Sequence, residues 1–150
     1  MYGMQAFACV LNGKIMPNKM KINKDLIIGD TNKTLEDLVI PDTGWRDITF
    51  GTGYSNWDTT VFNSCQCRKI GNIVYLKGLL KKNSGSASGY DIIAYLPEGF
   101  RPSKRILISC LINQRETTRI DIHNDGSMRL PSGIWDDMNM ISFEGIFFFV

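Results

Sequence analysis

The chain has 150 residues, of which 43% are hydrophobic and 21% charged, and its formal net charge is +2. This length and composition are typical of one soluble globular domain with a short appendage, and they exclude disordered and fibrous proteins. The small net charge gives no reason to expect nucleic-acid binding, although basic residues gather in residues 59–90 and acidic residues in residues 120–150. We interpret the two groups as solvated faces of opposite sign, which can also help copies of the chain to meet.

The chain has few residues that could form a metal site or a disulfide. It contains four cysteines, at positions 9, 65, 67 and 110, and a single histidine, His123. Cys65 and Cys67 lie two residues apart on a predicted strand, so they share a face but are poorly oriented for a mutual disulfide. We expect small, buried, reduced thiols, with no metal and no cofactor. The most apolar run, residues 145–150, is too short to span a membrane, and the N-terminus carries no secretion signal, so we expect folding in a cytoplasm and no membrane insertion.

Residues 1–43 differ from the rest of the chain in their sequence pattern, which predicts only short, interrupted elements. The pattern predicts a strand at residues 6–11, a turn at Asn12-Gly13, a strand-like stretch at residues 26–28 and one helical turn near residues 34–38. A segment with such short elements cannot form a hydrophobic core of its own, so we expect a stem or linker that packs on another part of the protein or on a partner. The remaining residues, 44–150, are then the folded domain.

From Gly44 onward the pattern is all β. Residues 61–70 and 73–80 alternate as two strands that reverse at Gly71-Asn72, which is a hairpin signature. A glycine- and serine-rich loop leads to a strand at residues 92–96, and residues 96–102, LPEGFRP, form a rigid corner. In that corner Gly99 permits a left-handed turn and Phe100 can reach the core, while Arg101 points outward.

The second half of this domain continues in the same way. Residues 106–113, 117–123 and 127–130 are predicted as three consecutive antiparallel strands, and residues 138–150 as a final apolar strand with a bulge at Gly145. Eight or so short strands with turn residues between them predict an antiparallel β-sandwich or jelly roll. The apolar terminal strand, residues 146–150, needs to be covered by its own sandwich or by a neighbouring copy.

Several ordered motifs resemble one family. Gly44-Trp45 is followed by CRKIGNIVYLKG, YLPEGFRP, RIDIHNDGSMRL, GIW and MISF, and is preceded by INKDLIIGDTNKTLEDL. This set resembles the C-terminal head domain of tail-fibre and baseplate receptor-binding proteins of phages that infect Gram-positive bacteria. The resemblance implies a homotrimeric head at the tail tip of the virion, in contact with other tail or baseplate proteins, which adheres to a host cell-wall polysaccharide or glycopolymer without a cofactor.

Two stretches carry the side chains that saccharides need, which are flat aromatic rings beside polar groups that hydrogen-bond hydroxyls. The first is the loop that holds Tyr54 and Trp57, although Trp57 is equally well explained as a core residue. The second joins His123 and Asp125 to Trp135 and Asp136.

This second set resembles the saccharide pocket of lactococcal phage heads. An arginine completes that pocket in the family, and Arg119 is our candidate, with Arg115 and Arg129 as alternatives. The simpler interpretation is that Asp125 is a turn residue before Gly126, His123 a polar strand end and Trp135 a core anchor.

Catalysis is not expected, because no carboxylate pair, phosphate-binding loop, nucleophile motif or metal-ligand cluster stands out in the sequence. The alternative function is that of a structural baseplate or collar component, which holds its neighbours in the tail and does not touch the host.

Overall fold

In this computed structural model the described residues are 10–11, 14–15, 39–83, 87–113, 115–131, 134–135 and 139–150. The chain forms two compact units, Met1–Ile40 and Pro41–Val150. In the first unit β1 (Val10–Leu11) pairs antiparallel with β2 (Lys14–Ile15), on either side of the predicted Asn12-Gly13 turn. The strand predicted at residues 26–28 and the helical turn near residues 34–38 lie outside the described residues. The division into a stem and a head stays a prediction.

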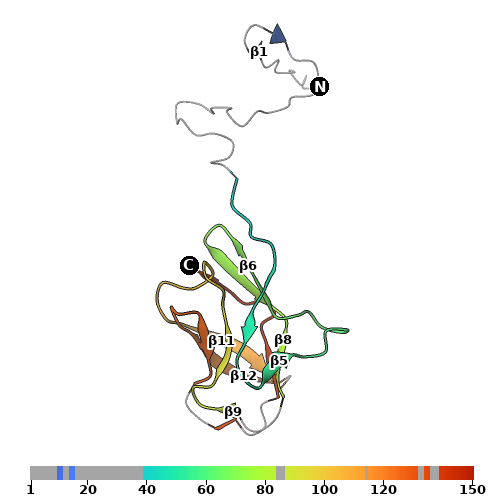
Figure 1. Cartoon of the computed structure of the whole chain (residues 1–150), viewed down its shortest axis with the longest axis vertical. Coiled ribbons are helices and arrows are strands. Elements are labelled where there is room, and N and C mark those ends of the chain that lie inside the picture. Colours follow the sequence, from blue (N-terminus) through green and yellow to red (C-terminus); the bar gives the residue numbers. More distant parts are fainter. Residues whose placement is uncertain are drawn as a thin grey trace, which may run out of the picture. The chain divides into compact units, whose positions relative to one another are not determined.

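The second unit is all β with antiparallel pairing, as expected, and its strands belong to three sheets (Figure 1). The four-stranded sheet has the order β16-β7-β6-β3 and consists of β3 (Arg46–Asp47), β6 (Gln66–Ile70), β7 (Ile73–Lys77) and β16 (Phe147–Phe149). The eight-stranded sheet has the order β4-β10-β13-β12-β11-β15-β8-β5 and consists of β4 (Thr49–Phe50), β5 (Tyr54–Asn56), β8 (Leu79–Lys82), β10 (Ile92–Tyr95), β11 (Ile106–Ile112), β12 (Glu116–Ile122), β13 (Ser127–Arg129) and β15 (Met140–Ser142). A small sheet pairs β9 (Ala87–Ser88) with β14 (Ile134–Trp135).

The eight-stranded sheet nearly closes on itself as a barrel. Its two edge strands, β4 and β5, are consecutive in the chain and are joined only by residues 51–53. The amide of Gly51 donates to the carbonyl of Ile93 at 3.0 Å, and the amide of Asn83 donates to the carbonyl of Gly53 at 2.8 Å. The short loop is therefore hydrogen-bonded to β10 and to the end of β8, the strands next to the two edge strands, which leaves little free edge.

Two predicted strands are wrong because the chain changes sheet within them. Residues 73–80 are split at Gly78 into β7 and β8, and residues 138–150 are split near Gly145 into β15 and β16. Both glycines have positive φ, +102° at Gly78 and +76° at Gly145, which lets the backbone leave one sheet for the other. The predicted strand at residues 61–70 is also too long, because the amides of Val61 and Phe62 donate to the carbonyl of Asp58 in a turn.

The hairpin and the proline corner are confirmed. Ile70 pairs with Ile73 across the Gly71-Asn72 turn. In the corner Gly99 has a φ of +85°, and Phe100 is buried. Arg101 is exposed, but its Nε also donates to the carbonyl of Leu96 at 3.2 Å, so its side chain helps to hold the corner as well as pointing outward.

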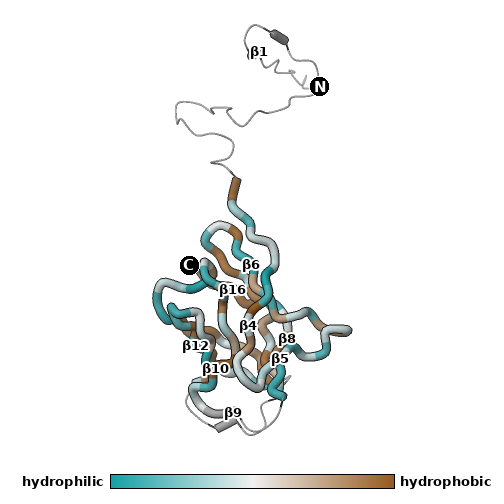
Figure 2. The backbone as a smooth tube through the Cα atoms, viewed as in Figure 1, coloured by the Kyte–Doolittle hydropathy of each residue, from teal (hydrophilic) through white to brown (hydrophobic). Residues whose placement is uncertain are grey.

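One apolar core joins the two larger sheets. It contains inward residues of the four-stranded sheet, such as Val74 and Phe148, together with Leu80, Ile120 and Ile141 of the eight-stranded sheet. Figure 2 shows apolar stretches along these strands and hydrophilic stretches in the connecting loops. Burial of this kind is the main source of stability in a domain of this size.

The described cysteines, Cys65, Cys67 and Cys110, are free and buried. Burial raises their pKa to about 11 or 12, so the thiols are protonated at neutral pH and poor nucleophiles. Within the described part of the chain no cluster of His, Cys, Asp and Glu is arranged to hold a metal ion. Nor do the described residues include a helix of the length and apolar character needed to cross a membrane.

Candidate functional site

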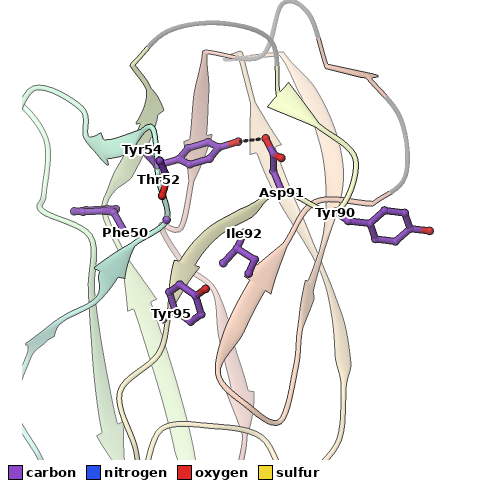
Figure 3. A pocket seen from close by; sticks show the side chains of 8 residues that line it. Phe50, Thr52, Tyr54, Tyr90, Asp91, Ile92 and Tyr95 are labelled. Carbon is purple, nitrogen blue, oxygen red and sulfur yellow. Dashed lines mark hydrogen bonds between the residues drawn. The ribbon is translucent and has the colours of Figure 1, made fainter.

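A pocket of about 370 Å³ lies beside the point where the barrel closes (Figure 3). It is lined by Phe50, Gly51, Thr52, Tyr54, Tyr90, Asp91, Ile92 and Tyr95. These residues come from both edges of the eight-stranded sheet, from the closing loop and from the turn that precedes β10. The pocket is thus a consequence of the closure, and its volume suits a ligand of the size of one sugar ring.

A bulge in β10 turns its side chains toward this pocket. The pairing of β10 with β13 shifts register between Ile92 and Ala94, and both Ile93 and Ala94 are fully buried in the core. Because Ile93 and Ala94 both point inward, the residues on either side of them, Ile92 and Tyr95, both lie on the outer face, where they line the pocket. A regular strand would place alternate side chains on that face and would not present this pair.

Three polar side chains form a hydrogen-bonded group at one wall. The hydroxyl of Tyr54 donates to Oδ2 of Asp91 at 3.2 Å, and Figure 3 shows this bond as a dashed line. Nζ of Lys82 lies 3.4 Å from the same carboxylate oxygen and 4.7 Å from the centroid of the Tyr54 ring. The side chain of Lys82 is only 10% exposed, so this ion pair is partly shielded from water.

The protonation of Tyr54 is fixed by this environment. Its own burial and the charge of Asp91 both raise the pKa of the tyrosine, because each disfavours a phenolate. Tyr54 therefore remains a donor, Asp91 is positioned by it, and Lys82 supplies a nearby positive charge. The pocket therefore offers a carboxylate acceptor, held by Tyr54 and Lys82, beside the aromatic surface of Tyr95, and such a combination suits a polyol.

Tyr90 stands at the rim in a strained backbone conformation. Its φ is +69°, a value that bulky residues rarely adopt, and its side chain is 65% exposed and extends away from Asp91 in Figure 3. An exposed aromatic ring in the left-handed region contributes little packing to offset its strain. Strained residues of this kind are concentrated at functional sites, which favours this pocket as a candidate site.

Replacing Tyr90 by glycine is expected to leave the free energy of unfolding unchanged or to raise it by up to about 1 kcal/mol, because relief of backbone strain offsets the entropy of glycine. Replacing the buried Tyr54 by alanine is the contrasting variant and should cost about 3 kcal/mol or more. Urea unfolding measures both. A loss above about 2 kcal/mol in Tyr90→Gly would mean that the ring is packed and that the strain argument is wrong.

The other aromatic residue predicted in this loop lies elsewhere. Trp57 is half-buried and lines a second, apolar pocket of about 450 Å³ together with Phe62, Leu79, Leu111, Met140 and Ser142. Its amide donates to the carbonyl of Leu79 at 2.8 Å. Tyr54 and Trp57 therefore line different pockets, and a part for Trp57 in ligand binding stays a prediction.

The predicted His123 and Asp125 lie in the hairpin between β12 and β13. Oδ1 of Asp125 accepts hydrogen bonds from the amide of Ser127 at 2.8 Å and from its hydroxyl at 2.7 Å, and these bonds lower the pKa of Asp125. The amide of Gly126 donates to the carbonyl of His123 at 2.9 Å. Asp125 thus has the turn role that the simpler interpretation gives it, and a part in ligand binding stays a prediction.

The remaining predicted residues are placed as follows. Arg119 lies on β12, two residues before Asp121, and Nε of Arg119 is 2.9 Å from Oδ1 of that carboxylate. Trp135 belongs to β14 and pairs with Ala87 of β9. Asp136 lies outside the described residues. The convergence of histidine, aspartate, tryptophan and arginine that the resemblance implies stays a prediction.

Sequence reasoning missed Asp91, Tyr95 and Lys82. The signal available was Tyr90-Asp91 directly after a glycine- and serine-rich loop, a place where polar and aromatic residues are often presented. Lys82 lies opposite Tyr54 in the pairing of β5 with β8. Asp91, 37 residues away from Tyr54 in sequence, is brought to it by the closure of the barrel, which no local pattern reports.

No protein-family model matches the chain, and no curated protein matches it. Among solved structures the chain is similar to the receptor-binding protein (gp15) of Listeria phage PSA, with a TM-score of 0.56 and 22% sequence identity. The match covers 76% of this chain and 68% of the phage protein. At this level of identity the likeness establishes a shared fold.

Proposed function

We propose that this protein is the head of a phage tail receptor-binding protein and that it binds a saccharide of the host cell surface. The observation that carries the proposal is the pocket of Tyr54, Asp91 and Tyr95 at the barrel closure, on a fold shared with a phage receptor-binding protein. The ordered sequence motifs support the same assignment. The protein then acts by binding alone, at the tail tip of the virion and beside other tail or baseplate proteins.

The pocket would bind a sugar through two kinds of contact. Tyr95 offers an aromatic surface to the C–H groups of the ring, and the Asp91 carboxylate accepts hydrogen bonds from ring hydroxyls. Lys82 and Tyr54 hold Asp91 before the ligand arrives, so that little side-chain entropy is lost on binding. His123 and Asp125 on the neighbouring hairpin are proposed as additional contacts for a longer glycan.

Binding to wall polysaccharides from a panel of Gram-positive bacteria tests the proposal. In Asp91→Asn the affinity should fall by about tenfold or more, because a charge-assisted acceptor is lost, and Tyr95→Ala should cause a similar loss. Asp47→Asn is the matched control, since it removes an equal charge from the other sheet. His123→Ala should cause a smaller loss.

The outcomes separate the candidate sites. Full affinity in Asp91→Asn and Tyr95→Ala, with loss only in His123→Ala, would move the site to the hairpin. Absence of binding to every polysaccharide would favour the alternative of a structural tail component, which the exposed apolar surfaces described below would also suit.

We further propose that the protein is a homotrimer. The outer face of the four-stranded sheet carries Phe147 and Phe149, which are 58% and 70% exposed, in rows with Tyr75 and Ile73. The ring centroids of Tyr75 and Phe147 are 6.2 Å apart. A solvated sheet face normally carries polar side chains, so an apolar row that reaches the edge strand β16 favours coverage by a neighbouring copy. Three weak saccharide sites on one trimer would gain avidity.

A further inference from the structure

Two arginines on the outer face of the eight-stranded sheet share one buried carboxylate. Asp121 of β12 is only 2% exposed, and its oxygens contact Nη2 of Arg105 and Nε of Arg119. The two arginine side chains are 49% and 48% exposed, so each keeps part of its guanidinium in solvent. A single carboxylate neutralises one of the two charges and holds both groups in place.

A third guanidinium continues this basic surface. The register of the sheet sets Arg129 of β13 directly opposite Asp121, and Nη2 of Arg129 lies 3.7 Å from Oδ2 of the more exposed Asp125. The three arginines face two carboxylates, which leaves one positive charge in excess. The adjoining loop exposes two further cations, Arg101 and Lys104, against one acid, Glu98. The surface is therefore built to attract an anion.

The same register connects this cluster to the aromatic pocket. Arg129 pairs with Ile92, which lines the pocket, and on its other side with Asp121. Neighbouring strands lie about 4.8 Å apart, so the backbones at Ile92 and Asp121 are about 10 Å apart on one face of one sheet. That spacing is the length of roughly two sugar units or one sugar and its charged substituent.

We propose that Arg105 and Arg119, positioned by Asp121, bind an oxyanion carried by the glycan whose sugar occupies the neighbouring pocket, and that this oxyanion is a phosphate group. The link to a glycan rests on the proposed function, whereas the anion site itself stands on its own. A phosphate has several oxygens that can accept hydrogen bonds from two guanidinium groups. The partly exposed N–H donors of both arginines lie beside the same buried carboxylate, Asp121. Arg129 adds a charge on the side that faces the pocket.

Titration of the full chain with inorganic phosphate, followed by NMR through the Nε–Hε signals of the arginines, tests the anion site. The signals of Arg105 and Arg119 should shift and saturate, and acetate should act more weakly. Arg119→Lys keeps the charge and the ion pair with Asp121 but loses the planar set of N–H donors of the guanidinium, so phosphate affinity should fall about fivefold. Arg46→Lys, at an exposed arginine on β3 of the other sheet, is the matched control and should change nothing.

Shifts of Arg105 and Arg119 no larger than that of Arg46, or equal phosphate affinity in Arg119→Lys, would overturn the proposal. The amide signals of β12 report whether the variant keeps its fold. Phosphorylated dextran and carboxymethyl dextran, compared with neutral dextran, distinguish the two oxyanions, and tighter binding of the carboxylated form would reject phosphate. If Asp91→Asn leaves host polysaccharide binding intact while inorganic phosphate still binds at the arginines, the proposed saccharide pocket fails and the anion site survives.

Discussion

Replacing Gly51 by alanine is expected to lower the free energy of unfolding by about 3 kcal/mol or more and the melting temperature by roughly 10 °C. A β-carbon at this position would lie 1.8 Å from the carbonyl oxygen of Ile92, which is backbone and has little room to move. To relieve the contact, the closing loop must separate from β10, and the hydrogen bond from the amide of Gly51 to Ile93 is lost. The same movement opens the pocket, so saccharide binding should fall with stability.

Gly53→Ala is the matched control in the same loop. Gly53 has a φ of +84°, but a β-carbon there would meet nothing within 4 Å, so only the backbone conformation is strained and the cost should be about 1 kcal/mol. Urea unfolding of both variants measures the difference between them. Equal and small losses would mean that β4 and β5 do not hold the barrel closed as described.

Replacing both Phe147 and Phe149 by serine is expected to convert a trimer into a monomer. Both rings lie on the outer face of β16, on either side of the buried Phe148. Phe147 is paired with Tyr75 of β7, and Phe149 with Ile73. Because they are largely exposed in the single chain, their removal should cost the monomer little stability. In a trimer each would bury its ring, at about 1.5 to 3 kcal/mol per side chain. Sedimentation equilibrium at several concentrations measures the mass.

The control for this variant is a double replacement of Leu107 and Val61 by serine. These residues are also exposed and apolar but lie outside the four-stranded sheet, on β11 and on the loop after β5. The control should remain a trimer. A parent chain that is monomeric at every concentration, or a trimer that survives loss of both phenylalanines, would contradict the proposed interface.

Local features of the fold were well predicted from sequence because short-range chemistry determines them. The Gly71-Asn72 turn and the proline corner at residues 96–102 depend on residues within a few positions of one another. The strand breaks at Gly78 and Gly145 were missed, because apolar residues continue on both sides of each glycine while the chain passes to another sheet. A period of two reports which side chains point inward and does not report the sheet to which a strand belongs.

The candidate site was predicted only in part for the same reason. Tyr54 is recognisable as an aromatic residue among turn residues, and the structure places it at a pocket. Its partners Lys82 and Asp91 come from β8 and from the turn before β10, and only the closing of the sheet brings them together. Arg119 is a sequence-based candidate for the arginine of the family's pocket, and its ion pair with the buried Asp121 depends on burial that the sequence does not reveal.

Chemical-shift mapping with a wall oligosaccharide, on protein labelled with ¹³C in its tyrosine rings and ¹⁵N in its backbone, tests the central claim most directly. We expect the largest changes at the Tyr54 and Tyr95 rings and at the amides of Asp91 and Ile92. Changes should extend through Arg129 toward Arg119 if the oligosaccharide carries phosphate. Changes confined to the hairpin of His123 and Asp125, or to the apolar pocket of Trp57, with the Tyr54 and Tyr95 signals unmoved, would contradict a saccharide site at the barrel closure.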